Sequence, residues 1–195
     1  MINTRLIASV ICTFLAVVML VLGCVSPAQE QVNKGRPLSN PDHWDEAIAA
    51  YTKAIELDPK LAEAYYRRGK VYADKGDYDK AIADNTKAIE IDPKYVAAYC
   101  SRAYAYGKSG DLDKAIADCN KIMEIDPKNG YPYYLRGTAY AFKGDDDQAI
   151  ADYTRAIELD PKLCMAYSNR ADAYEKKGEK AKAEADLQMS IKCTY

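Results

Sequence analysis

Residues 62–95 read AEAYYRRGKVYADKGDYDKAIADNTKAIEIDPKY, and residues 96–129, which follow without a gap, read VAAYCSRAYAYGKSGDLDKAIADCNKIMEIDPKN. The same residues recur at fixed positions of the two stretches. Two further rows, 130–163 and 164–195, continue in the same register. A 34-residue period that persists over four rows predicts a repeat architecture, in which one small unit is copied and stacked on itself.

Five positions of the row are chemically almost constant. Positions 4 and 11 are tyrosine in every row, positions 8 and 20 are Gly or Ala, and position 32 is proline wherever a row reaches it. Large and small residues at these spacings indicate two amphipathic helices that pack closely against each other. The tyrosines are Tyr65, Tyr99, Tyr133 and Tyr167 at position 4 and Tyr72, Tyr106, Tyr140 and Tyr174 at position 11; the small residues are Gly69, Ala103, Gly137 and Ala171 at position 8 and Ala81, Ala115, Ala149 and Ala183 at position 20.

The pattern resembles the tetratricopeptide repeat, a 34-residue helical hairpin. The resemblance implies an all-α fold, a right-handed superhelical solenoid of antiparallel helix pairs. We expect helices at about positions 1–14 and 17–30 of each row. The first helices should end at left-handed glycines, and the second should begin after N-capping acids. The glycines are Gly76, Gly110, Gly144 and Gly178, and the capping residues are Asp77, Asp111, Asp145 and, more weakly, Glu179.

The repeats account for residues 44–195. Rows 62–95, 96–129, 130–163 and 164–195 are four full repeats, and residues 44–61 match the second half of another. Its first half would fall on residues 24–43, where Pro27, Gly35, Pro37 and Pro41 prevent a continuous helix. We therefore interpret residues 24–43 as a linker and expect one leading helix before the first full repeat.

One pair of positions carries opposite charges in every full repeat. Position 7 is Arg68, Arg102, Arg136 or Arg170, and position 23 is Asp84, Asp118, Asp152 or Asp186. In a hairpin that turns near position 15 these positions lie at the same height, so the pair can form within one repeat. The leading half repeat has Ala50 at position 23, so an Asp serving the next repeat would leave Arg68 unpaired. We expect pairing within each repeat; the alternative is a solvated row of charges.

The N-terminus has the pattern of an export signal. Residues 1–5 carry a positive charge, residues 6–23 form an apolar run, and Cys24 follows. Val21-Leu22-Gly23-Cys24 resembles a bacterial lipobox, although such motifs usually have Leu and then Ala or Ser where this chain has Val21 and Leu22. We favour a signal segment at 1–23 with lipid attached to Cys24. An uncleaved membrane-spanning anchor and an ordinary cleaved signal remain open. Each alternative puts the repeats outside the cytoplasm, and we expect the membrane-anchored protein at the cell envelope.

The sequence offers little for catalysis. His43 is the only histidine, and it lies in a Pro-rich loop, so a nucleophile paired with histidine is not expected. No CxxC pair and no phosphate-binding glycine loop is present. The net charge of −2 lacks the basic excess of a nucleic-acid binder. We expect no enzyme activity, no cofactor, no metal and no small-molecule substrate.

The resemblance implies a binding groove on the concave face of the first helices. In the family this groove is lined mainly by positions 2, 5, 6, 9, 12 and 13. In this chain those positions are aromatic and apolar in the middle and charged at the ends, which suits an extended or helical segment of a protein partner. We therefore expect a membrane-anchored interaction or scaffold module; the alternative is an envelope assembly factor that forms homo-oligomers. The groove residues predicted to bind are Tyr66, Arg67, Lys70, Tyr104, Tyr131, Tyr134, Phe142 and Met165.

Four cysteines fall in pairs within two of the repeats. Cys100 and Cys119 lie at one height across their hairpin, and so do Cys164 and Cys193. Export favours oxidation, but helix axes packed 8–10 Å apart often keep two Cα atoms beyond disulfide reach. Either pair can be a disulfide or two free thiols, and Cys164–Cys193 is the more favourable because frayed helix ends can adjust.

Overall fold

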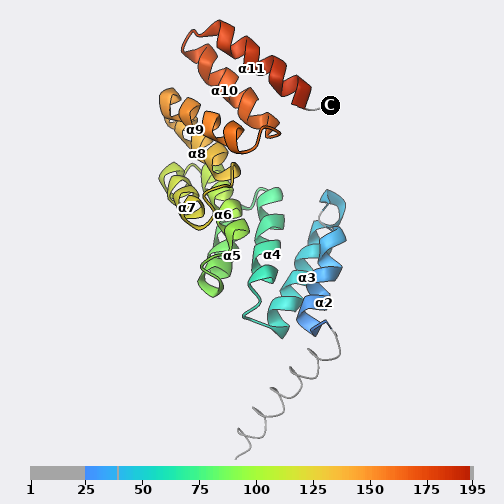
Figure 1. Ribbon diagram of the computed structural model, residues 1–195. Coiled ribbons are helices and arrows are strands. Elements are labelled where there is room, and N and C mark those ends of the chain that lie inside the picture. The colour runs from blue at the N-terminus through green and yellow to red at the C-terminus, as the bar shows by residue number, and fades with distance from the viewer. Residues whose placement is uncertain (1–24, 39, 194–195) are drawn as a thin grey trace, which may run out of the picture.

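The computed structural model describes residues 25–38 and 40–193. Over these residues it contains ten α-helices and no strand, and the helices pack as consecutive antiparallel pairs (Figure 1). The expected all-α solenoid is confirmed. The helices are α2 (Pro27–Gly35), α3 (Trp44–Leu57), α4 (Ala62–Asp74), α5 (Tyr78–Ile91), α6 (Val96–Ser109), α7 (Leu112–Ile125), α8 (Tyr131–Lys143), α9 (Asp146–Leu159), α10 (Cys164–Lys176) and α11 (Lys180–Cys193), with the short 3₁₀ turns η1 (Arg36–Leu38) and η2 (Pro41–His43) between α2 and α3.

The turns inside the hairpins follow the expected chemistry. Gly76, Gly110, Gly144 and Gly178 have φ angles between 77° and 91°, a left-handed conformation that glycine adopts without a steric cost. Asp77 and Asp145 cap the second helices of their hairpins, accepting hydrogen bonds from the backbone of Lys80 and Gln148 at 3.4 and 3.2 Å. The capping prediction was wrong for Asp111, whose side chain accepts from Lys114 Nζ at 2.7 Å and makes no cap bond.

Small residues at positions 8 and 20 bring the two helices of each hairpin close together. Ala81, Ala115 and Ala149 are almost fully buried. A Cβ atom added at Gly137 would lie 3.2 Å from the Ala149 carbonyl oxygen and 2.9 Å from the Tyr153 ring. The helix backbones can approach this closely only because the side chains between them are small.

The arginine at position 7 pairs with the aspartate of its own hairpin in all four repeats. Arg102 donates from Nε and Nη2 to the two carboxylate oxygens of Asp118 at 2.8 and 2.7 Å. The third nitrogen of the same guanidinium donates to Thr86 Oγ1 of the preceding hairpin at 2.9 Å. Pairing within the repeat is therefore confirmed, and the same side chain also joins neighbouring repeats. The other three arginines do the same through Thr52, Asn120 and Thr154.

The N-terminal end of the solenoid differs from the sequence prediction. Part of the expected linker is the helix α2, which packs on α3 and completes a fifth, shortened hairpin. Pro27 is tolerated because it lies in the first helical turn after the Ser26 N-cap, where its missing N–H costs nothing. Val32 is fully buried with Tyr51, and Gly35 lies so close to the Tyr51 ring that a Cβ atom would meet it at 2.5 Å.

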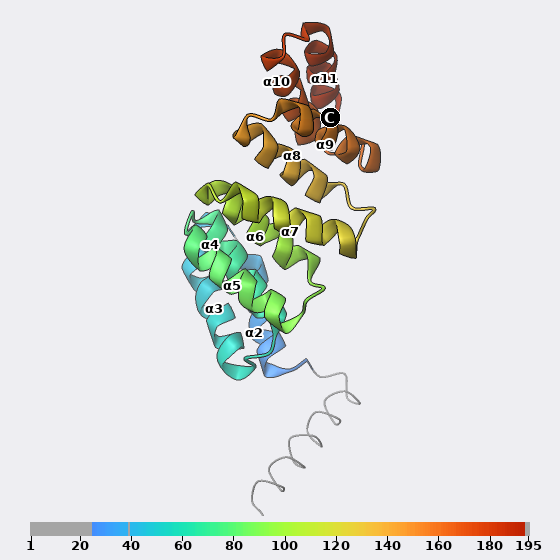
Figure 2. The same ribbon diagram turned by 90° about the vertical axis from the view of Figure 1, so that its left-hand side faces the viewer.

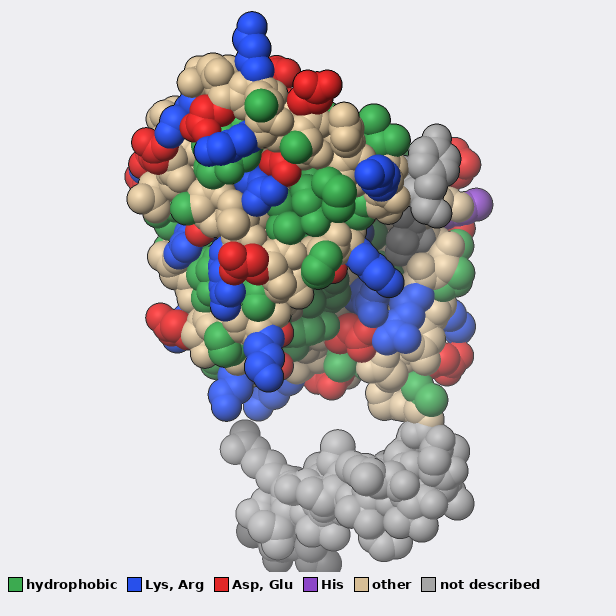
Figure 3. Space-filling model, turned by 45° about the horizontal axis from the view of Figure 1, so that its top comes forward, with side chains coloured by type: hydrophobic (Ala, Val, Ile, Leu, Met, Phe, Trp, Pro, Cys, Tyr) green, Lys and Arg blue, Asp and Glu red, His purple; other side chains and the backbone are tan. Residues whose placement is uncertain are grey.

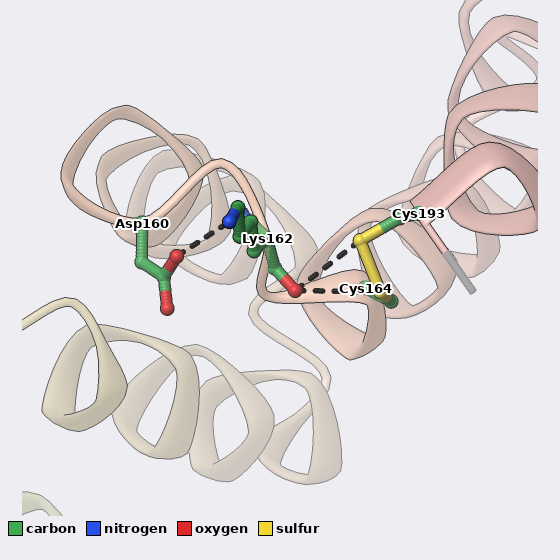
Figure 4. The surroundings of a disulfide bond; sticks show 4 residues. All are labelled: Asp160, Lys162, Cys164 and Cys193. Atoms are coloured by element: carbon green, nitrogen blue, oxygen red, sulfur yellow. Dashed lines mark hydrogen bonds between the residues drawn. A yellow bond between two sulfur atoms is a disulfide. The ribbon is translucent and has the colours of Figure 1, made fainter. Parts of the chain in front are cut away.

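The C-terminal hairpin is closed by a disulfide. Cys164 at the start of α10 is bonded to Cys193 at the end of α11, with the Cα atoms 5.5 Å apart (Figure 4). Cys100 and Cys119 are free thiols. Of the two pairs considered from the sequence, the structure forms the one at the helix ends.

Cys24 and the apolar run before it lie outside the described residues. Within the part of the chain that the structure describes, no helix is both long and apolar enough to cross a bilayer.

A second series of ion pairs joins neighbouring hairpins through residues 30 positions apart. Lys75 donates to Asp45 at 2.5 Å, Lys143 to Asp113 at 2.6 Å, and Lys177 to Asp147. The second full repeat breaks the series, because Ser109 stands where the other repeats have lysine. Asp79, which would be its partner, makes no ion pair with any described residue.

We predict that Ala115→Leu overpacks the α6–α7 hairpin, because Ala115 lies between these two helices and is only 3% exposed. The expected cost is about 1–3 kcal/mol in the free energy of unfolding, measured by denaturant titration. Ala117→Leu, on the exposed face of α7, is the matched control and should change stability little. Equal behaviour of the two variants would contradict the assigned packing.

We also predict that Ser109→Lys completes the second series of ion pairs by reaching Asp79. The gain should be small, as for other exposed pairs, and should diminish with added salt. Melting temperatures of Ser109→Lys with and without Asp79→Ala separate the stability gained from the ion pair from the gain due to a better helix-forming residue. A gain that is unchanged by Asp79→Ala would show that no ion pair forms.

Candidate binding groove

The first helices of the hairpins form one continuous inner surface. Helices α4, α6, α8 and α10 contact one another in succession, and each second helix packs against the first helix of its own pair and, up to α9, against that of the next pair along the stack (Figure 2). Side chains from the predicted groove positions 2, 5, 6, 9, 12 and 13 therefore project from successive helices onto one surface. On the face shown in Figure 3, hydrophobic side chains gather in the middle with Lys and Arg side chains beside them.

The first of three hollows in this surface lies between α4 and α6 and has a volume of about 600 Å³. Three tyrosines surround it, and Ser101, Asn129 and Cys100 add polar atoms and a thiol. Burial raises the pKa of the Cys100 thiol to about 11, so this cysteine is protonated at neutral pH and is a poor nucleophile. The lining residues are Tyr66, Lys70, Ala73, Asp74, Val96, Ala97, Cys100, Ser101, Tyr104, Asn129 and Tyr131.

The second hollow lies between α6 and α8, reaches the start of α10, and has a volume of about 300 Å³. It shares Tyr104 and Tyr131 with the first hollow, and burial raises the pKa of the Tyr131 hydroxyl to about 12. Its other lining residues are mostly apolar: Ala103, Gly107, Lys108, Ala115, Tyr134, Leu135, Thr138, Ala139, Phe142 and Met165.

Three of the exposed large apolar side chains among the described residues line the second hollow. Phe142 is 70% exposed, Met165 51% and Tyr104 39%. A soluble domain normally buries such side chains, so a group of them around one hollow indicates a surface that another molecule covers.

A third, smaller hollow of about 220 Å³ lies between α8 and α10. Phe142 and Thr138 belong to both the second and the third hollow, so the surface is continuous from α4 to α10. The remaining lining residues are Ala141, Tyr153, Asn169, Asp172, Ala173 and Lys176.

The structure brings together seven of the eight residues predicted to bind. Tyr66, Lys70, Tyr104 and Tyr131 line the first hollow, and Tyr134, Phe142 and Met165 join Tyr104 and Tyr131 in the second. Arg67 does not line either hollow; its Nε donates to Glu63 at 3.1 Å, and its guanidinium lies over the Tyr66 ring.

Several residues that line the hollows lie outside the positions expected from the sequence. Val96 and Asn129, at the two ends of the row, line the first hollow, and Asn129 accepts a hydrogen bond from the Tyr131 backbone at 3.0 Å. Gly130 starts the next row, and a Cβ atom there would meet the Ala156 carbonyl oxygen at 2.9 Å. In the sequence, the pair Asn129-Gly130 at the junction of two rows could have indicated this local turn.

Charges in the groove are mostly neutralised. Lys70 pairs with Asp74 at 2.9 Å, and Lys176 lies 3.6 Å from Asp146. Among the described residues, no group of three or more His, Cys, Asp or Glu side chains is placed to hold a metal. The arrangement offers surfaces for contact and hydrogen bonding.

Models of the tetratricopeptide repeat match residues 62–95, 96–129 and 166–192, and a further model of the TPR repeat matches residues 43–76 and 139–178. Together these matches cover most of the chain. This chain belongs to the tetratricopeptide repeat family. None of the curated proteins matches its sequence significantly.

Solved structures of other tetratricopeptide repeat proteins resemble this one. A crystal structure of MamA is 26% identical with a TM-score of 0.71, covering 87% of this chain and 95% of that one. YrrB, described as a TPR protein with an unusual peptide-binding site, is 26% identical with a TM-score of 0.64 and covers 84% of each chain. A thermophilic TPR protein from Thermus thermophilus shares the fold, at 21% identity, a TM-score of 0.72 and coverage of 85% of this chain and 90% of that one. The chain is thus a protein–protein interaction module by family.

Proposed function

We propose that this chain holds a segment of a partner protein in the groove formed by α4, α6, α8 and α10. The observation that carries the proposal is the group of exposed apolar side chains, Tyr104, Phe142 and Met165, around a hollow between these helices. Aromatic and apolar anchors in such hollows commonly contribute most of the binding energy at an interface. The residues proposed to bind are Tyr66, Lys70, Tyr104, Tyr131, Tyr134, Phe142 and Met165, with Arg67 at the edge.

The groove differs chemically from one that clamps a terminal carboxylate. Such a clamp needs several cationic donors that converge on one point. Lys70, Lys108 and Lys176 each lie in a different hollow, so they do not converge on one point, and Lys70 and Lys176 each have a carboxylate neighbour. Contact with internal apolar side chains of the partner is therefore the favoured mode, and YrrB is a relative whose description includes a peptide-binding site.

We further propose that the N-terminal segment keeps the repeats at a membrane outside the cytoplasm, through lipid on Cys24. The support is the apolar run at residues 6–23 that ends in Gly23-Cys24. The α2–α3 hairpin begins a few residues later, so the repeats would lie near the membrane surface rather than at the end of a long tether. The module would thus recruit or scaffold a partner at the cell envelope.

We predict that Tyr134→Ala strongly weakens partner binding while Lys70→Ala changes it little. Tyr134 lies between Tyr131 and Tyr153, with ring centroids 5.8 and 6.1 Å away, and it lines the second hollow. Its loss should weaken binding by about tenfold or more. The measurement is calorimetric titration of the full chain with a purified partner identified by cross-linking in envelope extract.

Circular dichroism and melting curves should first show that both variants are folded. Loss with Lys70→Ala and normal binding with Tyr134→Ala would contradict the proposal. Loss of binding after amidation of the partner's C-terminus would contradict it as well, because it would show recognition of a terminal carboxylate.

For the anchor, we predict that Cys24→Ser leaves an unprocessed precursor and abolishes incorporation of labelled fatty acid. The thiol of Cys24 is the proposed attachment atom, and serine cannot replace it in a thioether. Labelling of the wild-type chain and the variant in cells, followed by electrophoresis, checks the prediction. A wild-type chain that is never labelled would indicate a membrane-spanning or cleaved segment instead.

A further inference from the structure

We infer that the second hollow selects a partner segment in which a large apolar side chain stands next to an acidic one. The apolar side chain would enter the hollow, and the carboxylate would pair with Lys108 at its rim. This inference rests on the proposed function of the groove and specifies the chemistry of the partner.

The first observation is a glycine without a packing role. Gly107 lies inside α6 with an ordinary helical conformation, where glycine is less favourable than alanine. A Cβ atom added at Gly107 would meet nothing within 4 Å. The structure therefore does not need glycine there for the fold. The open space above Gly107 belongs to the second hollow and leaves the helix backbone accessible to a partner.

The second observation is the charge of Lys108. Three lysines line the hollows, and Lys70 and Lys176 each have a carboxylate neighbour within 4 Å. Lys108 has none among the described residues; its ammonium lies over the Tyr104 ring, 5.6 Å from the ring centroid. A cation at the rim of an apolar hollow, with no carboxylate of its own, is complementary to an acidic group on the partner.

A negative charge, the carboxylate of Asp172, lies on the other side of the apolar surface from Lys108. Asp172 lines the third hollow and forms no ion pair with a described residue. Because Phe142 lies between the second and third hollows, an acidic group on the partner is favoured beside Lys108 and disfavoured beside Asp172. The bound segment should therefore lie with its acidic side chain toward Lys108 and away from Asp172.

The walls of the hollow suit an aromatic or long aliphatic side chain. Leu135 and Phe142 come from α8, and Met165 comes from α10, where its sulfur lies 3.8 Å from the Tyr134 hydroxyl. Methionine is flexible and polarizable, so it can adapt to the shape of either kind of side chain.

The test uses the full chain in lipid nanodiscs and a displayed library of random linear peptides. Selected peptides that depend on Tyr134 should share a large apolar residue within a residue or two of Asp or Glu. Lys108→Glu should weaken such a peptide by about tenfold, and replacing the acidic residue of the peptide by Lys should restore much of the loss. Lys60→Glu, at an exposed lysine in the turn between α3 and α4 that lines none of the hollows, is the matched control and should have little effect.

A second pair of variants tests the open space. Gly107→Gln should fill the hollow and weaken the peptide by about tenfold or more, while the melting temperature stays the same or rises because glycine is a poor helix former. Ala117→Gln adds the same side chain to the outer face of α7 and should leave binding unchanged.

The outcomes separate this inference from the proposed function. Peptides that require Tyr134 but carry no acidic residue, or that bind Lys108→Glu normally, would overturn the inference and leave groove binding intact. Selection of no peptide that depends on Tyr134 would overturn both. A charge reversal that is rescued by the swapped peptide would support both.

Discussion

The two helices of each hairpin approach so closely at positions 8 and 20 that only glycine or alanine fits between them, and the rest of the solenoid depends on this contact. A Cβ atom at Gly69 or Gly137 would lie 3.2 Å from the carbonyl oxygen of Ala81 or Ala149. Glycine occupies position 8 where position 24 across the hairpin is Tyr51, Asn85 or Tyr153, and alanine occupies it where position 24 is Cys119 or Leu187. The close approach holds positions 7 and 23 at one height, so each arginine meets its aspartate.

The arginine at position 7 then connects this local contact to the stacking of hairpins. One guanidinium binds a carboxylate of its own hairpin with two nitrogens and a Thr or Asn of the preceding hairpin with the third. It also lies near the ring of the tyrosine at position 4 and, in the second and fourth repeats, position 11. Half-buried ion pairs add little net stability, because desolvation offsets their attraction, but breaking one is costly. Here the pairs form only in the helix alignment that the close contact at positions 8 and 20 sets, so they disfavour other alignments.

Most of this framework could be predicted from the sequence, because identical columns in four rows carry the packing rules directly. The first hairpin could not, because Gln31 in α2 and Leu38 in η1 stand where the other repeats have tyrosine. Only Gly35, in register with position 8, and the small Ala47 at position 20 indicate it. The groove residues were predictable by position, but Arg67 was not excluded, because its pairing with Glu63 depends on the rotamers of both side chains. Lipid attachment at Cys24 and binding of a partner segment in the groove remain predictions.

The residues that differ between repeats lie where a partner would bind. Position 13 is Asp74, Lys108, Phe142 and Lys176 in successive rows, and none of these side chains contributes to the contacts between positions 7, 8, 20 and 23. Substitutions there change the surface and leave the hairpins intact, because each repeat is stabilised by its own contacts and those to its neighbours. The order of repeats also fixes the order of groove side chains in space. A partner that lies along the groove therefore meets Lys108, Phe142 and Asp172 in that sequence, so its own side chains must follow a matching order.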